Sequence, residues 1–163
     1  MSPLLRTQSP PWRPSAILLV LAGISVAAIG LYFLAWRPPL LPEDLRFLGM
    51  DGASHSSLPS RLPEWLSHVF HVLGGHALAS GLLAVALAAT GFRQRRAVAV
   101  ALVVAAGISG MGLMALTNFV IGSDFRWLLL GLTALWVASL VCFVLEARAP
   151  TSTPHFTSKG IEL

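Results

Sequence analysis

Three histidines occur close together in an otherwise apolar stretch, at His68, His71 and His76. An ionisable side chain inside a membrane is costly, and it usually faces the bundle interior or a cavity where it serves a proton or ion pathway. At about 100° per residue the three rings share one broad face of a helix. The spacing indicates a proton relay or a small-ligand site, with interhelical hydrogen bonding as the structural alternative.

The three rings differ in expected depth. Counted at about 1.5 Å per residue from the start of the stretch, His68 lies about 4 to 5 Å in, His71 about 9 Å and His76 about 16 Å. Only His76 approaches the middle of the membrane, at the depth expected for Ser25 and Ser109. We therefore expect His76 to lie in a small buried polar layer.

A second polar set follows a later apolar run, at Asn118, Asp124 and Arg126. These side chains are expected to meet His68 and His71 in an outer-facing cluster, which would suit a proton relay, a small polar ligand or a metal ion. The alternative is a solvated surface turn. A metal site needs three or four converging ligands, and no second helix carries histidine or cysteine opposite the pair, so we predict no metal site.

Standard catalytic signatures are absent from the sequence. It contains no nucleophile elbow, no zinc-protease motif, no phosphate-binding loop and no pair of intramembrane carboxylates. Haem held by two histidines would need a second histidine-bearing helix, and the other apolar runs have none. We predict no catalytic residue and no cofactor, with quinone or a metal ion as alternatives, and a binding role is favoured over an enzymatic one.

The elements that must position these groups are four apolar runs. The chain has 163 residues, of which 55% are hydrophobic and 11% charged, and its mean hydropathy is +0.75. A spanning helix needs about 20 apolar residues, and its backbone groups must pair within the segment because lipid offers no partner. We predict an all-α integral membrane bundle of four transmembrane helices, at about residues 15–36, 65–91, 97–122 and 126–146.

The segments outside these helices differ in character. The outer loop, residues 37–64, carries Pro-Glu-Asp at 42–44, where acidic groups would favour a helix start, and we expect a short interfacial helix there. The tails, residues 1–14 and 147–163, are polar and rich in proline, and we expect both to be disordered. Residues 15–146 then form the transmembrane domain.

Positive charge predicts the orientation. Lys and Arg in short loops are retained in the cytoplasm, and the connection 92–96 reads Phe-Arg-Gln-Arg-Arg. Both termini are therefore expected inside, in the bacterial inner (cytoplasmic) membrane. The net charge of +4 does not indicate nucleic acid binding, because the arginines are spread over both sides; membrane lipid is the expected partner.

Small residues spaced four apart recur along the predicted helices. Gly23 and Ala27 form such a pair in the first, and Gly75 with Ala79 and Ala77 with Gly81 form two in the second. Such spacing lets helix backbones approach closely in lipid. It favours a compact bundle, and a homo-oligomer or a larger membrane complex is compatible with it.

Several of these residues also carry a family resemblance. The segment 42–50, followed by His68 and by the pairs Gly-Gly at 74–75 and Gly-Leu at 81–82, resembles an uncharacterised group of small bacterial membrane proteins. These look like distant relatives of the DoxX-like four-helix proteins. The resemblance covers roughly residues 15–146 and implies a four-helix membrane architecture.

The chain departs from that group at two chemical positions. The histidine of the group is commonly followed by Asp and Arg, whereas Val69 and Phe70 follow His68 here. A histidine often found near the end of the third helix corresponds to Asn118. The wider class is linked to quinone-associated redox complexes, so the resemblance supports architecture more than activity.

Together these patterns favour a non-catalytic accessory subunit or small-ligand binder. Two alternatives stay open. One is a subunit of a quinone-linked membrane redox complex, and the other is a minimal transporter or proton pathway that uses the histidines of the second helix.

Overall fold

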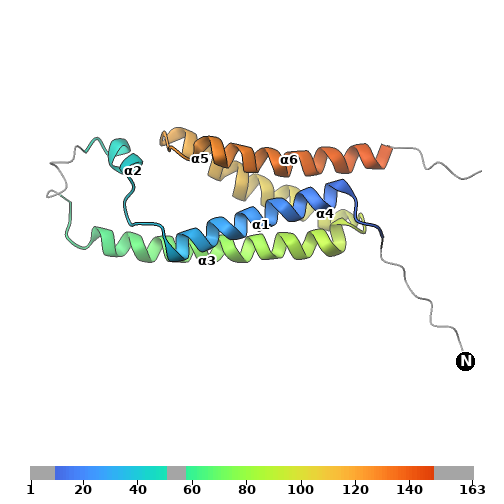
Figure 1. The fold of residues 1–163 in the computed structure, drawn as a ribbon, viewed down its shortest axis with the longest axis horizontal. Helices are drawn as coiled ribbons and strands as arrows, with labels where there is room; N and C mark the ends of the chain where they lie inside the picture. The colour runs from blue at the N-terminus through green and yellow to red at the C-terminus, as the bar shows by residue number, and fades with distance from the viewer. Residues whose placement is uncertain (1–9, 51–57, 149–163) are drawn as a thin grey trace, which may run out of the picture.

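The structure is a computed structural model that describes residues 10–50 and 58–148. Helices make up most of this part of the chain, and it contains no strand. The elements are α1 (Pro14–Ala35), α2 (Pro42–Phe47), α3 (Leu62–Leu87), the π-helical turn η2 (Ala88–Phe92), α4 (Ala97–Ala106), a second π-helical turn η3 (Gly107–Gly112), α5 (Leu113–Val120) and α6 (Arg126–Arg148) (Figure 1).

Four of the resulting helical rods are long and apolar enough to cross a membrane. They span Pro14–Ala35, Leu62–Phe92, Ala97–Val120 and Arg126–Arg148. The predicted all-α class with four transmembrane helices and one additional short helix is therefore confirmed. By the length and composition of these helices the chain is a multi-pass membrane protein, while its orientation and the membrane in which it resides stay predictions.

Helix boundaries follow local chemistry. The second span begins at Leu62, before the expected residue 65, because Pro63 occupies the first turn, where its missing N–H would have no partner anyway. The expected disorder of the tails falls largely on residues 1–9 and 149–163, which lie outside the described residues. Where the tails are described, α1 already includes Pro14 and α6 continues to Arg148.

Glycines set the closest helix contact, between α1 and α3. Gly23 and Gly30 on α1 meet Gly81 and Gly74 on α3, so two glycine pairs seven residues apart face each other in antiparallel register. A Cβ on Gly30 would overlap the backbone of Leu78. The backbones can therefore pack directly, as expected for small residues in lipid. Gly75, expected in this role, faces open space instead.

The π-helical turn η3 interrupts the third span where α6 packs against it. A Cβ on Gly107 would overlap the indole of Trp136, so only glycine fits this approach. A π-helical turn disturbs the regular hydrogen-bond ladder of a helix, and neighbouring side chains can satisfy backbone groups freed in this way. Thr133 on α6 donates from its hydroxyl to the carbonyl of Met111 at 3.2 Å and to that of Leu129 at 2.9 Å.

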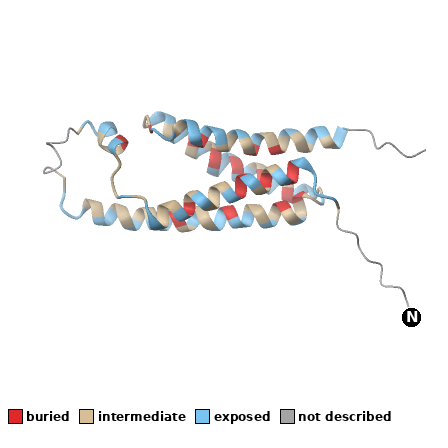
Figure 2. Cartoon of the chain, viewed as in Figure 1, coloured by how far each residue is buried: buried red, intermediate tan, exposed pale blue. Residues whose placement is uncertain are grey.

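The buried core lies toward one end of the bundle, which we call the arginine end because the connection with Arg93, Arg95 and Arg96 lies there. Its buried members are Ala16, Leu19, Ala22, Ala88, Phe92, Val103, Met111 and Trp136. Within the described residues, none of them comes from the other half of α1 or from α3. Figure 2 shows that much of each helix surface is exposed in the isolated chain.

Toward the opposite end, which we call the α2 end, the helices separate into two pairs. One pair is α1 with α3 and the other is α5 with α6; no Cα atom of α5 lies within 8 Å of one in α1 or α3. In Figure 1 the two pairs diverge toward the side where α2 lies. The bundle is therefore joined by its core at the arginine end and open along part of its length.

Candidate functional site

The three histidines lie on the outer surface of α3. His68, His71 and His76 are all exposed, because the contact face of α3 is the one that carries Gly74 and Gly81. The Nδ1 atom of His71 lies 2.6 Å from the carbonyl oxygen of Ser67, and that of His76 lies 2.8 Å from the carbonyl of Val72. A neutral ring satisfies such a contact with its proton on Nδ1, which leaves Nε2 as an acceptor.

The expected buried polar layer around His76 is not formed. His76 is exposed, and the serines expected at its depth bond within their own helices: Ser25 donates to the Leu21 carbonyl at 2.9 Å and Ser109 to the Ala105 carbonyl at 2.8 Å. Such back-bonding satisfies a hydroxyl without a second helix.

The second predicted set, Asn118, Asp124 and Arg126, does not come together as a cluster either. Asn118 donates from Nδ2 to the carbonyl of Met114 at 2.9 Å, within its own helix. Asp124 forms an exposed ion pair with Arg46 at 2.7 Å, and Arg126 forms no ion pair among the described residues. No hydrogen bond within the described part of the chain joins this set to the histidines, and no three potential metal ligands come together there.

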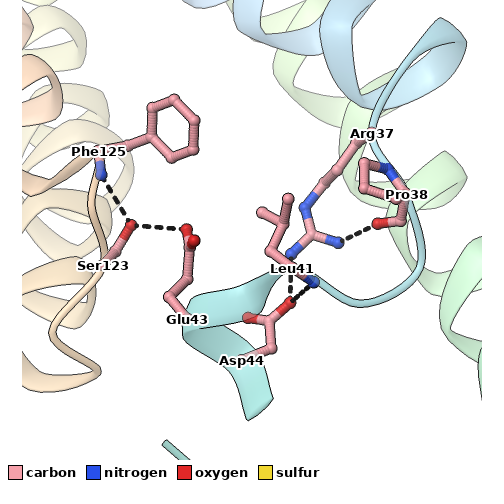
Figure 3. Close-up of polar contacts among 7 residues, drawn as sticks. All are labelled: Arg37, Pro38, Leu41, Glu43, Asp44, Ser123 and Phe125. Atoms are coloured by element: carbon pink, nitrogen blue, oxygen red, sulfur yellow. Dashed lines mark hydrogen bonds and ion pairs between the residues drawn. The ribbon is translucent and has the colours of Figure 1, made fainter. Parts of the chain in front are cut away.

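A polar cluster that was not predicted from the sequence surrounds α2. Arg37, two residues after the end of α1, places its guanidinium 3.4 Å from the centroid of the Phe70 ring on α3. It also donates to the carboxylate of Asp44 on α2 at 3.2 Å (Figure 3). Its side chain is only 7% exposed. A desolvated cation over an aromatic face is a strong contact, so Arg37 ties α2 to the α1–α3 pair.

The other side of α2 contacts the α5–α6 pair. Glu43 is 4% exposed and accepts a hydrogen bond from the Ser123 hydroxyl at 3.2 Å. The same hydroxyl oxygen accepts from the backbone N–H of Phe125 at 3.1 Å (Figure 3). Together with the Arg46–Asp124 ion pair, these contacts make α2 a strap that links the two helix pairs at the α2 end.

Between the helix pairs lies an apolar cavity of about 640 Å³, which we call the crevice. It is bounded by α1, α3, the third span and Trp136 of α6. The lining residues are Leu19, Ala22, Gly23, Val26, Ile29, Phe33, Leu73, Ala77, Ser80, Leu83, Ala84, Leu87, Leu102, Val103, Ala106, Gly107, Ser109, Gly110, Met111, Met114 and Trp136. None of these side chains titrates near neutral pH, so the crevice offers dispersion contacts and no acid–base group.

The crevice opens sideways. Three of its lining residues are also well exposed: Leu73 by 50%, Leu83 by 70% and Leu102 by 54%. Because these residues belong to membrane-spanning helices, the surroundings they face are hydrocarbon. A lipid-soluble molecule can therefore enter without crossing water.

The arginine end holds a third polar group, centred on Glu146. Its carboxylate accepts from the backbone N–H of Ser15 at 2.9 Å, from the Ser15 hydroxyl at 2.8 Å and from Arg95 at 2.9 Å. The anion thus caps the start of α1, where the free N–H groups and the helix dipole favour negative charge. The contact fastens α6 to both α1 and the α3–α4 connection.

Two of these polar residues had a usable signal in the sequence. Glu146 is the only carboxylate near the end of the last apolar run, on the side predicted to hold the arginine-rich connection 92–96. Arg37 directly follows the first run, with Asp44 seven residues later. The pairing of Glu43 with Ser123 joins residues 80 positions apart, and no local pattern indicates it.

No family model, curated protein or solved structure matches the chain. The resemblance to DoxX-like bacterial proteins is therefore not supported by these comparisons, and function has to be argued from the site itself.

Proposed function

We propose that the chain is a membrane-embedded binding protein that holds the apolar chain of a lipid-soluble ligand in the crevice. The observation that carries this proposal is the crevice itself, about 640 Å³ of apolar-walled space between two helix pairs. Small-molecule sites typically enclose about 300 to 1,000 Å³ and are lined mainly by apolar side chains.

The lining favours a chain-like ligand. Apart from the indole N–H of Trp136, the only polar groups among the lining side chains are the hydroxyls of Ser80 and Ser109, and the hydroxyl proton of Ser109 is already donated to its own helix. Recognition must therefore come from shape and dispersion. Met111, Met114 and Trp136 suit this role because a thioether and an indole provide large polarisable surfaces.

The walls are held in place by contacts between the helices. The glycine pairs fix α1 to α3, Gly107 fixes the third span to Trp136, and the strap limits how far the pairs separate at the α2 end. A cavity with supported walls loses less conformational entropy on binding than one that must form around its ligand. This arrangement favours a binding role, as an accessory subunit or carrier, over a catalytic role.

The test is a substitution that fills the crevice. Gly110 lines it, and a Cβ there would meet nothing within 4 Å, so Gly110→Trp adds an indole at the cavity wall without a backbone clash. Displacing only two methylene groups of a bound chain would lower its affinity roughly tenfold, at about 0.8 kcal/mol per buried CH₂. Native mass spectrometry after detergent exchange measures how much long-chain ligand the protein retains.

Gly131→Trp is the matched control. Gly131 also has open space around its Cβ position, but it lies on α6 outside the crevice lining. We expect the Gly131 variant to retain ligand like the unaltered chain and the Gly110 variant to lose it. Equal retention by both variants would contradict the proposal.

The quinone-linked redox alternative would use the same crevice, because an isoprenoid tail is an apolar chain. A retained quinone, identified by its mass and by its ultraviolet difference spectrum on reduction, would favour it. The histidine pathway has less support, since none of the three rings lines the crevice and all are exposed on α3.

A further inference from the structure

We propose that the ligand is an anionic phospholipid whose head group binds beside Arg96 at the arginine end, while one of its acyl chains runs into the crevice. This inference rests on the proposed function, because the crevice supplies the place for the chain. It adds the chemical class of the ligand, which the apolar walls alone do not determine.

The head-group position is a separate cavity of about 350 Å³, which we call the notch. It lies between the end of the second span and the start of the third. Its lining residues are Leu87, Thr90, Gly91, Gln94, Arg96, Val98, Ala99 and Leu102. Thr90, Gln94 and Arg96 make one part of the wall polar, and the leucines and Val98 make the rest apolar, as an amphipathic ligand requires.

The notch and the crevice adjoin. Leu87 and Leu102 belong to the walls of both cavities. A head group in the notch is therefore next to the point at which a chain would enter the apolar space. This adjacency lets a polar and an apolar cavity serve one lipid molecule, with the head group in the first and an acyl chain in the second.

Charge favours an anion in the notch. Of the three arginines in the connection, Arg95 is neutralised by Glu146 at 2.9 Å, whereas Arg93 and Arg96 form no ion pair among the described residues. Arg93 stacks over the Trp12 ring at 4.7 Å, and its Nε is buried without a hydrogen-bond partner. Glu146, the only described carboxylate at this end, is occupied by three donors.

The turn between the second and third spans places Arg95 against α6 and Arg96 in the wall of the notch. Arg95 adopts a left-handed backbone conformation, with φ of 57°, and contacts α6 through Glu146 and the Phe143 carbonyl. Arg96, the next residue, lines the notch between the second and third spans. A structural arginine and a free one are thus placed on different sides of the same turn.

The polar wall matches a phosphodiester that also carries a hydroxyl. The planar guanidinium of Arg96 can bind two phosphate oxygens at once. The Thr90 hydroxyl donates its proton to the Ala86 carbonyl at 2.7 Å, so it can only accept a further hydrogen bond, such as one from a head-group hydroxyl. Phosphatidylglycerol has both groups, whereas phosphatidylcholine has a positive charge near Arg96 and no hydroxyl donor in its head group.

The experiment compares these two lipids with the same chains. The delipidated full-length chain in mild detergent is offered equimolar phosphatidylglycerol and phosphatidylcholine, and native mass spectrometry gives the ratio of the two adducts. We expect a preference of about fivefold or more for phosphatidylglycerol, because phosphatidylcholine places a positive charge near Arg96 and has no hydroxyl that could donate to Thr90. Arg96→Gln should reduce the ratio to below about twofold, because it removes the cation that disfavours the choline group.

Arg148→Gln is the matched control, since it removes one exposed positive charge from the same end of the bundle without touching the notch. It should keep the preference. Equal ratios for the Arg96 and Arg148 variants would overturn the head-group assignment. The proposed function fails separately, if Gly110→Trp retains as much total lipid as Gly131→Trp.

Competition with a soluble head group tests whether the site binds a phospholipid or a free phosphate ester. Glycerophosphoglycerol at millimolar concentration should not displace the bound phospholipid, because it lacks the chain that the crevice holds. Its displacement of the lipid at similar concentration would show that the notch recognises the phosphodiester alone, and the lipid assignment would be wrong.

Discussion

Ser123 and Asp124 are neighbours in the chain, and both bind α2, yet their surroundings differ. The Ser123 hydroxyl donates to Glu43, whose residue exposure is 4%. Asp124 pairs with Arg46, and the two side chains are 62% and 59% exposed. Removing one partner of a buried hydrogen bond lowers stability more than removing one partner of an exposed contact, because the buried group left behind cannot form a hydrogen bond to water instead.

The first prediction follows from this contrast. Ser123→Ala should lower the free energy of unfolding by about 1 to 3 kcal/mol, because it leaves buried Glu43 and the Phe125 N–H without their partner. Asp124→Ala should cost less than about 1 kcal/mol, since exposed ion pairs contribute little. Unfolding in mixed detergent micelles, followed by circular dichroism, measures both. Equal losses would mean that Glu43 is not held through Ser123.

The residue types show which polar side chains a helix carries, but they do not show which way those side chains face in the bundle. The histidines were expected to face inward because lipid disfavours polar side chains. They face outward instead, because α3 packs closely against α1 through the face that carries Gly74 and Gly81. The seven-residue spacing that Gly74–Gly81 shares with Gly23–Gly30 was the signal for that face. Gly75, adjacent in sequence, points to open space.

At the scale of elements, η3 determines how the third span meets α6. Gly107 admits the Trp136 ring, and the Thr133 hydroxyl satisfies the Met111 carbonyl. The apolar run at 97–120 predicts a helix, but a π-helical turn differs from an α-helical one by a single extra residue. Apolar periodicity over so short a segment does not separate the two, so η3 was not predictable from the sequence.

The second prediction compares two glycines in this turn. Gly107→Ala should lower the free energy of unfolding by about 1 to 3 kcal/mol, because a methyl group would overlap the buried Trp136 ring. Gly110→Ala has open space and should be neutral or stabilising by up to about 1 kcal/mol, since alanine loses less backbone entropy than glycine. The same micelle titration measures both variants. A Gly107→Ala variant as stable as Gly110→Ala would contradict the close approach of η3 to Trp136.

At the scale of the whole molecule, two helix pairs are joined at both ends and separated between them. The core and Glu146 hold the arginine end, and the strap holds the α2 end. The number and class of helices were predictable because each apolar run must satisfy its own backbone in lipid. The crevice was not predictable, because it depends on which pairs of helices touch, and the residue types in the four runs do not indicate the pairing.

The quenching of Trp136 fluorescence tests the central claim that this crevice holds an apolar chain. The other four tryptophans, Trp12, Trp36, Trp65 and Trp127, are at least 51% exposed and can be replaced by Phe, which leaves Trp136 in the crevice wall, itself 8% exposed. Lipids with brominated chains quench an indole that they contact.

We predict strong quenching of this single-tryptophan chain in brominated lipid, because a chain in the crevice lies against the Trp136 ring. Gly110→Phe in the same background should weaken the quenching by filling the space. Quenching that is unchanged by Gly110→Phe would contradict the account, since the lipid would then reach Trp136 without occupying the crevice.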